Sequence, residues 1–488
     1  MNAIIKKVIL KITLILLTIS FFLGLILFIK NRHQQTLRRE PEPWMTIFVH
    51  GSFGSLLGFL NVPTVLSGSV EGTMYKDLNK KLRRNTLFFK DQPILQKGLI
   101  RFEPTFDIKA TDGRPYVVYP IAKAYESILN EVKLGQEKNY FYTFGWSGLI
   151  TQSRRQQEAI RLYNALSVEL EKLHKQGIFP KIRIISHSHG GNLCLNLAAI
   201  NMAIKANSIE EIDKHSSNPD EIDTLKKVFL LIQKLPPYLT ALGQTTQKRH
   251  DYTPVNKNMK IDEFIAIATP IQPETECLFA SPFFNKVYHI YSDEDYVQRS
   301  DWVSSRKAYS RQIISDDIIA KSSDGKHPRI TQVQIKVEFD PLTEQPELKQ
   351  NKPEQRDASI WSELLSGEKP FTRTSKNPSH KEFWFVSWTP ESPEFVSFLS
   401  PLPLVIFVPF IINALEKNPD LNNVDINIKP TEKHIKLLIH QHEDVYSKAK
   451  AHLPISILVK LKTQFEAWRP AQSTSRDADF EIIHNSLR

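Results

Sequence analysis

The chain has 488 residues, of which 41% are hydrophobic and 24% are charged, and its formal net charge is +10. These values predict a globular protein and exclude a disordered or fibrous one. Two cysteines exclude a disulfide framework, and their apolar neighbours predict that Cys194 and Cys277 are buried, unreactive thiols.

The first predicted element is an apolar run at residues 12–29 that contains no charged side chain. It is long enough for a transmembrane helix, and no small-residue cleavage pattern follows it. We therefore expect residues 1–43 to form an uncleaved signal anchor and a linker, which hold the protein to a membrane by a single N-terminal span. Basic residues on both sides of the run leave its orientation undetermined, and with it the side on which the following domain lies.

The positive charge of the chain also points to a membrane. Residues 1–45 carry seven Lys or Arg and two Glu, a net +5 that is half of the total. The interleaving of aromatic and basic residues that single-strand nucleic-acid binders use is absent, so we expect no nucleic-acid partner.

The body of the chain alternates predicted strands and helices. Strands are expected at residues 44–51, 139–148, 181–187, 261–270, 286–298 and 330–339, and helices at residues 151–177 and after residue 188. Segment 330–339 alternates apolar and polar residues, which predicts a half-exposed strand. Such alternation of elements predicts an α/β fold with a mostly parallel central sheet and flanking helices.

Residues 44–395 are predicted to form the main domain, with insertions at 54–137, 206–260 and 340–379. The first two insertions are expected to form a cap over the carboxyl edge of the sheet. Residues 396–488 are predicted to hold an apolar segment and a helical and strand extension. The apolar block at 395–415 contains three prolines, which argue against a transmembrane helix. We interpret the block as a buried segment, with a flap that touches a membrane or an acyl chain as the alternative.

The stretch "RIISHSHGGN" places Ser188 between an apolar strand and an apolar helix. A serine nucleophile needs such a sharp turn, because the turn lifts the hydroxyl away from the backbone. Small residues are needed two positions before and after it, and Ser186 and Gly190 occupy those positions. The helix that begins after Ser188 favours negative charge at this point.

This pattern resembles the nucleophile elbow G-x-S-x-G of the α/β-hydrolase superfamily, on the esterase and lipase side, with Ser186 in place of the first glycine. "IFVHGSFGS", "YTFGWSG", "IATP" and "YSDEDYVQ" resemble further landmarks of the family in matching order. The resemblance covers about residues 44–390.

The resemblance implies that Ser188 is the nucleophile and that the backbone N–H groups of His189 and Ser52 form the oxyanion hole, with Phe53 as a neighbouring candidate. It implies Asp295 as the acid, with Asp293 second, because "DYVQ" matches the family pattern. In this family the base follows the acid in the chain. His380 fits that place best, and His327 is the alternative.

Six other histidines are interpreted as having no catalytic role. His187 and His189 flank the nucleophile and are expected to be wall residues, and His50 is expected to brace the oxyanion loop. His434, His440 and His442 lie in a charged segment that we expect to be a solvated helix rather than a metal site. No metal and no organic cofactor is implied.

These observations predict a membrane-anchored serine hydrolase that cleaves carboxylic esters, lipids among them, through an acyl-enzyme. Two other classes stay open. The chain could be an inactive α/β-hydrolase-like scaffold that binds a partner at the membrane, or an amidase or acyltransferase that uses the same triad.

Overall fold

A computed structural model describes much of the chain. The described residues are 18, 20–25, 42–51, 99–107, 118–132, 138–146, 152–206, 208–215, 218–241, 259–295, 297–298, 301, 304–305, 309–322, 325–337, 377–380, 382–384, 386, 399–441 and 444–468. The chain divides into two compact units, residues 1–42 and 43–488, which are described separately.

In the first unit, residues 18 and 20–25 are helical and exposed. No helix within the described part of the chain has both the length and the apolar character that a membrane span requires. Most of the predicted anchor at residues 12–29 lies outside the described residues, so the anchor stays a prediction.

The second unit is built on one sheet, for which the structure describes ten strands in the order β10-β9-β8-β7-β6-β5-β4-β1-β3-β2. Neighbouring strands are parallel from β3 to β8, whereas β2, β9 and β10 pair antiparallel at the two ends. The α/β fold with a mostly parallel sheet is therefore confirmed. The strands are β1 (Trp44–Val49), β2 (Leu99–Phe102), β3 (Asn139–Phe144), β4 (Lys181–His187), β5 (Ile261–Ile267), β6 (Phe284–Tyr291), β7 (Arg329–Val337), β8 (Asn423–Pro430), β9 (His434–Gln441) and β10 (Asp444–Pro454).

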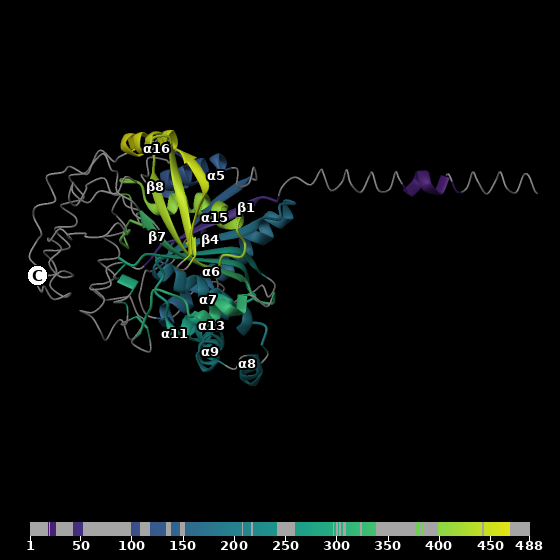
Figure 1. The fold of residues 1–488 in the computed structure, drawn as a ribbon. Coiled ribbons are helices and arrows are strands. Elements are labelled where there is room, and N and C mark those ends of the chain that lie inside the picture. Colours follow the sequence, from purple (N-terminus) through teal and green to yellow (C-terminus); the bar gives the residue numbers. More distant parts are fainter. Residues whose placement is uncertain are drawn as a thin grey trace, which may run out of the picture. The chain divides into compact units, whose positions relative to one another are not determined.

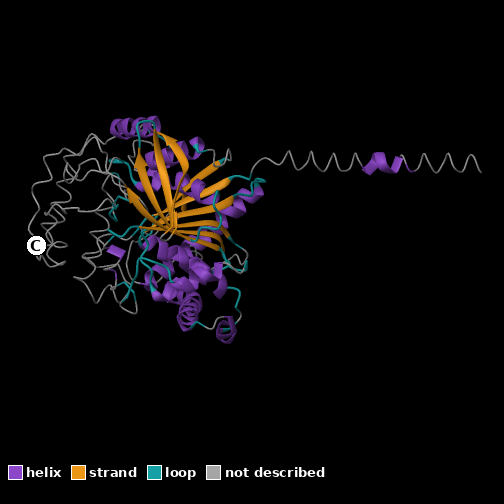
Figure 2. Cartoon of the chain, viewed as in Figure 1, coloured by secondary structure: helices purple, strands orange, loops and turns teal. Residues whose placement is uncertain are grey.

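Helices cover both faces of the sheet, as Figures 1 and 2 show. One face carries α5 (Val118–Glu131), the 3₁₀ helix η7 (Leu404–Phe407), α15 (Val408–Glu416) and α16 (Ile455–Trp468). The other carries α6 (Gln152–Lys175), α7 (His189–Ala203), α8 (Ile209–His215), α9 (Pro219–Ala241), α11 (Pro273–Glu276), η2 (Cys277–Ala280) and α13 (Asp316–Lys321). Side chains of one strand alternate between the two cores, so that Phe48 faces the first and Ile47 the second.

Two predicted boundaries are wrong. The proposed insertion at residues 54–137 includes β2, which pairs with β3, and α5, which packs into the first core. These elements belong to the sheet and its cover rather than to a cap. The proposed extension at 396–488 is also part of the main unit, because β8 pairs with β7 and extends the same sheet. The insertion at 340–379 lies almost wholly outside the described residues.

Two local predictions are corrected as well, and one is confirmed. β7 is buried on both faces rather than half exposed: Gln332 is 1% exposed and its side-chain oxygen accepts the N–H of Ile314 at 2.6 Å. A parallel strand with helices on both sides has no solvent face, so its polar residues must find internal partners. The interpretation of the apolar block as a buried segment is confirmed for its described residues 399–415, where Phe407 and Phe410 are fully buried. His434–Gln441 is a strand and not a helix.

The two cysteines are buried as predicted, Cys194 on α7 and Cys277 at the start of η2. Burial raises the pKa of both thiols, because it disfavours the thiolate. Neither thiol is activated as a nucleophile.

Candidate active site

Ser188 forms a sharp turn between the end of β4 and the start of α7. Its backbone has φ 53° and ψ −132°, a combination that costs a residue with a side chain about 1–3 kcal/mol. The Ser188 N–H donates to the carbonyl of Ile267 on β5 at 2.9 Å, which fixes the turn to the neighbouring strand. The hydroxyl makes no cap hydrogen bond to α7. The predicted sharp turn between a strand and a helix at Ser188 is thus confirmed.

The glycines around the elbow are required by close packing. A Cβ on Gly190 would meet the carbonyl oxygens of Val49, at 2.8 Å, and of His50. A Cβ on Gly51 would lie 2.7 Å from the Cβ of Ser188. The end of β1 therefore runs directly past the serine side chain. Only residues without a side chain allow this approach.

His50 is held at the end of β1 by its neighbours Gly51 and Trp146. Its Nδ1–H donates to the carbonyl of Gly51 at 2.7 Å, and its ring stacks on Trp146 with centroids 5.5 Å apart. The Trp146 indole N–H donates to the His50 carbonyl at 2.8 Å. The two residues that follow Gly51, Ser52 and Phe53, lie outside the described residues. The predicted oxyanion donor at Ser52 therefore stays a prediction.

The structure brings Asp295 and His380 together, although 85 positions separate them in the chain. His380 Nδ1–H donates to Asp295 Oδ2 at 2.8 Å, and Asp295 is fully buried. Its other oxygen, Oδ1, accepts the backbone N–H of Gln298 at 3.2 Å. With Nδ1 occupied as a donor, the neutral His380 ring carries its lone pair on Nε2. That nitrogen is then able to accept a proton.

Buried glutamines hold the loop that carries Asp295. Gln312 Nε2 donates to the carbonyls of Ser292 and Asp295, both at 2.9 Å. Gln298 Nε2 donates to the carbonyl of Thr269 at 2.8 Å. These contacts lie beyond the end of β6, at the carboxyl edge of the parallel sheet, where α/β proteins hold their ligands. Sequence reasoning did not find Gln298 or Gln312.

The alternatives for acid and base lie elsewhere. Asp293 is exposed, and its Oδ2 accepts a hydrogen bond from Gln334 on β7. His327 precedes β7 and contacts the carbonyl of Ala280 at 2.8 Å through its Nδ1. Because β6 and β7 are parallel, His327 lies at the amino edge of the sheet, opposite the edge that holds Asp295.

His380 also lies beside the elbow. The rings of His187 and His380 are 4.5 Å apart between centroids, and the carbonyl of His380 accepts a hydrogen bond from His187 Nε2 at 3.1 Å. Burial lowers the pKa of His187 well below 6.5, and the neighbouring charge of His380 lowers it further. His380 also acts to lower the pKa of His189. The base candidate is therefore in direct contact with His187, the residue before Ser188.

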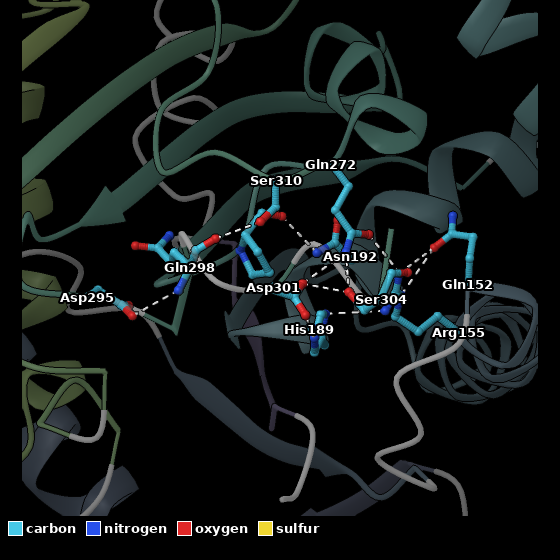
Figure 3. A network of polar contacts seen from close by, with 11 residues as sticks. Gln152, Arg155, His189, Asn192, Gln272, Asp295, Gln298, Asp301, Ser304 and Ser310 are labelled. Carbon is cyan, nitrogen blue, oxygen red and sulfur yellow. Dashed lines mark hydrogen bonds and ion pairs between the residues drawn. The ribbon is translucent and has the colours of Figure 1, made fainter. Parts of the chain in front are cut away.

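A buried polar network surrounds His189, the residue that follows Ser188, as Figure 3 shows. His189 Nε2–H donates to Asp301 Oδ1 at 3.1 Å, and Arg155 Nη1 donates to His189 Nδ1 at 3.3 Å. Gln272 joins the two charges, because its amide oxygen accepts from Arg155 at 2.7 Å and its amide nitrogen donates to Asp301 at 3.0 Å. The hydroxyl of Ser304 donates to Asp301 at 2.6 Å. A fully buried guanidinium and a buried carboxylate thus compensate each other through shared partners.

This network fixes the first residue of α7. Burial lowers the pKa of His189, and Asp301 opposes that shift. Both ring nitrogens of His189 are engaged, one by Arg155 and the other by Asp301. Its backbone N–H belongs to the first turn of α7, where such groups have no partner within the helix.

Among the described residues, no group of three or more His, Cys, Asp or Glu is arranged to hold a metal ion. His434 and His440 lie on β9, and His442 lies outside the described residues. Comparisons of the chain with protein-family models, with curated proteins and with solved structures found no match.

Proposed function

We propose that the protein is a serine hydrolase of the α/β-hydrolase type that cleaves carboxylic esters, with Ser188, His380 and Asp295 as its triad. The observation that carries the proposal is the 2.8 Å contact between His380 Nδ1 and the fully buried Asp295, beside the strained elbow at Ser188. The chain order Ser, Asp, His is the order of that superfamily.

In the proposed reaction, Ser188 Oγ attacks the ester carbonyl while His380 Nε2 takes its proton. Asp295 holds the ring in the required tautomer and stabilises the imidazolium that forms. The negative oxygen of the tetrahedral intermediate accepts the N–H of His189, at the positive end of α7, and that of Ser52. His380 then returns the proton to the leaving alcohol. Water, activated by the same base, releases the acid from Ser188.

We propose further that residues 12–29 anchor the protein to a membrane and that lipid esters are among its substrates. The anchor is supported by the uncharged apolar run, and the lipid proposal rests on the anchor alone. Extraction of membranes with alkaline carbonate tests the anchor: the full chain should stay with the lipid, and a chain that begins at residue 43 should be released.

A fluorophosphonate probe tests the proposed chemistry. It should label the wild-type protein and not Ser188→Ala. Ser186→Ala is the matched control, because it changes a buried serine of the same elbow whose hydroxyl donates to the carbonyl of Ile265 at 3.2 Å. This variant should still be labelled.

Folded wild-type protein that is never labelled would favour the non-catalytic scaffold. Labelling together with turnover of amides, or acyl transfer to an added alcohol in preference to water, would favour the amidase or acyltransferase alternative.

A further inference from the structure

His187 occupies a special place, because it is the last residue of β4 and directly precedes Ser188. Its register partner on β5 is Ile267, whose carbonyl also accepts the N–H of Ser188. The backbone of His187 is therefore fixed by the sheet on the side of the nucleophile. Its side chain is 2% exposed and extends to the segment that carries His380.

The contact between the two histidines has a defined direction. A carbonyl oxygen only accepts, so His187 Nε2 carries the hydrogen and donates it to the carbonyl of His380 at 3.1 Å. Burial keeps the ring neutral by lowering its pKa, which agrees with a single proton on Nε2. The ring also stacks on Trp384, with centroids 5.3 Å apart and planes inclined by 14°. One side chain thus contacts the His380 segment at two points.

Among the described residues, other contacts of the His380 segment are made by side chains: the His380 ring donates to Asp295 at 2.8 Å, and Trp384 also packs against Phe48. The described residues 377–380, 382–384 and 386 form turns rather than a helix or strand. One backbone contact is internal, from the Glu382 N–H to the carbonyl of Ser379 at 3.1 Å. Two others lead to η7, where the N–H groups of Leu404 and Val405 donate to the carbonyls of Glu382 and Phe383, both at 2.9 Å. The contacts to η7 hold the segment two and three residues after His380. The hydrogen bond from His187 holds the backbone of His380 itself.

From this geometry we propose that His187 is a positioning residue, which sets the place of the base relative to the nucleophile by holding the backbone of His380. The inference rests on the proposed function. Ser188 is covalently attached to His187, and His380 is bound to it by a hydrogen bond and ring contact. One rigid position at the end of β4 therefore determines the location of both groups.

Three variants separate this role from ordinary packing. His187→Phe keeps a ring against Trp384 and removes the donor, and His187→Met also removes the donor with a side chain that adapts to its surroundings. His187→Gln keeps an N–H donor. His327→Phe is the matched control, since it removes a histidine contact to a carbonyl at the opposite edge of the sheet.

Two measurements on the full-length chain test the proposal. Hydrogen exchange followed by mass spectrometry reports how firmly peptide 377–386 is held. Fluorophosphonate labelling reports the rate constant at saturating probe and, separately, the affinity for the probe. A base displaced by about 1 Å costs on the order of a hundredfold in rate.

We expect His187→Phe and His187→Met to lower the saturating labelling rate by about tenfold to a hundredfold, with probe affinity little changed. They should speed exchange in peptide 377–386 only. His187→Gln and His327→Phe should behave like the wild type in both measurements.

Unchanged exchange and rate in His187→Phe and His187→Met would overturn the proposal. So would equal losses in these variants and in His187→Gln. If the wild-type protein is not labelled at all, the proposed function fails. The exchange data then still decide whether His187 holds the His380 segment.

Discussion

Replacement of Asp295 by Asn changes one charge and almost no volume at the centre of the candidate site. Two donors point at this side chain, His380 Nδ1–H toward Oδ2 and the Gln298 N–H toward Oδ1. An aspartate accepts both, whereas an asparagine has a single acceptor oxygen. If the amide nitrogen faces His380, the ring must move its proton to Nε2 and is no longer a base. If the amide oxygen faces His380, the Gln298 N–H is left facing a donor.

The two effects of this substitution differ in size. One lost or unsatisfied hydrogen bond to a charged group costs about 1–3 kcal/mol of stability. The wrong tautomer of a triad histidine costs about 10⁴-fold in turnover, which is about 5 kcal/mol in the barrier. The expected result is therefore a large loss of kcat with a modest loss of stability. Asp293→Asn is the control, because Asp293 is exposed and binds Gln334 instead.

The assay is the steady-state hydrolysis of a short p-nitrophenyl ester, with thermal unfolding measured on the same preparations. Asp295→Asn should lower kcat by orders of magnitude, and Asp293→Asn should change it by less than about threefold. The reverse ranking would refute the assignment of the acid. A loss of activity in Asp295→Asn that only follows a loss of folded protein would refute its catalytic role.

Three further predictions concern the fold that holds the site. Phe410→Ala should destabilise the protein by about 3–5 kcal/mol, because Phe410 is fully buried. It should reduce activity on short and long esters equally. A selective loss on long esters would restore the lipid-flap interpretation. Gly190→Ala should abolish folding or fluorophosphonate labelling, since its Cβ would meet backbone oxygens. Gly177→Ala is the comparison, because a Cβ at that position has open space around it. It should lower the free energy of unfolding in urea by only about 1 kcal/mol, which is the strain of its positive φ. Burial lowers the pKa of His289 to about 4, so the unfolded chain binds a proton that the folded chain does not bind. Stability should therefore fall as the pH drops from about 6.5 toward 4, by up to about 3 kcal/mol from this residue, and unfolding curves of His289→Gln should depend less steeply on pH.

The elements that the sequence predicted well are those with a local signal. β4, β5 and β6 are apolar runs bounded by turns. The helix predicted at residues 151–177 is α6, Gln152–Lys175, and Gly177 with φ +75° follows its end. The elbow also has a local signal, because small residues beside Ser188 are required by the turn itself. Such features depend on neighbours a few positions away, and one sequence contains that information.

The errors come from contacts between distant segments. β7 alternates polar and apolar residues as an exposed strand would, but helices cover both of its faces and its glutamines bond internally. β2 is a short strand that only its pairing with β3 defines. The helices that cover a strand and the strand that pairs with it are distant in the sequence. The pattern of apolar and polar residues within the strand therefore could not reveal either of them.

The residues of the candidate site fall into the same two groups, those with a signal in the sequence and those that only the fold brings together. The residues themselves suggested Ser188, and the order of the family suggested Asp295 and His380. The network of Arg155, His189 and Asp301 could not be predicted, because its members are brought together by the fold from α6, α7 and a loop after β6. The carboxyl edge of a parallel sheet collects such residues from many parts of a chain.

The most direct test of the central claim is to locate the adduct that a fluorophosphonate forms with the full-length wild-type protein. Tandem mass spectrometry of the digested protein should find one phosphonate per chain, on Ser188, and the His380→Ala and Asp295→Asn variants should acquire it far more slowly. An adduct on another residue, or none on protein shown to be folded, would contradict the assignment of Ser188 as the nucleophile.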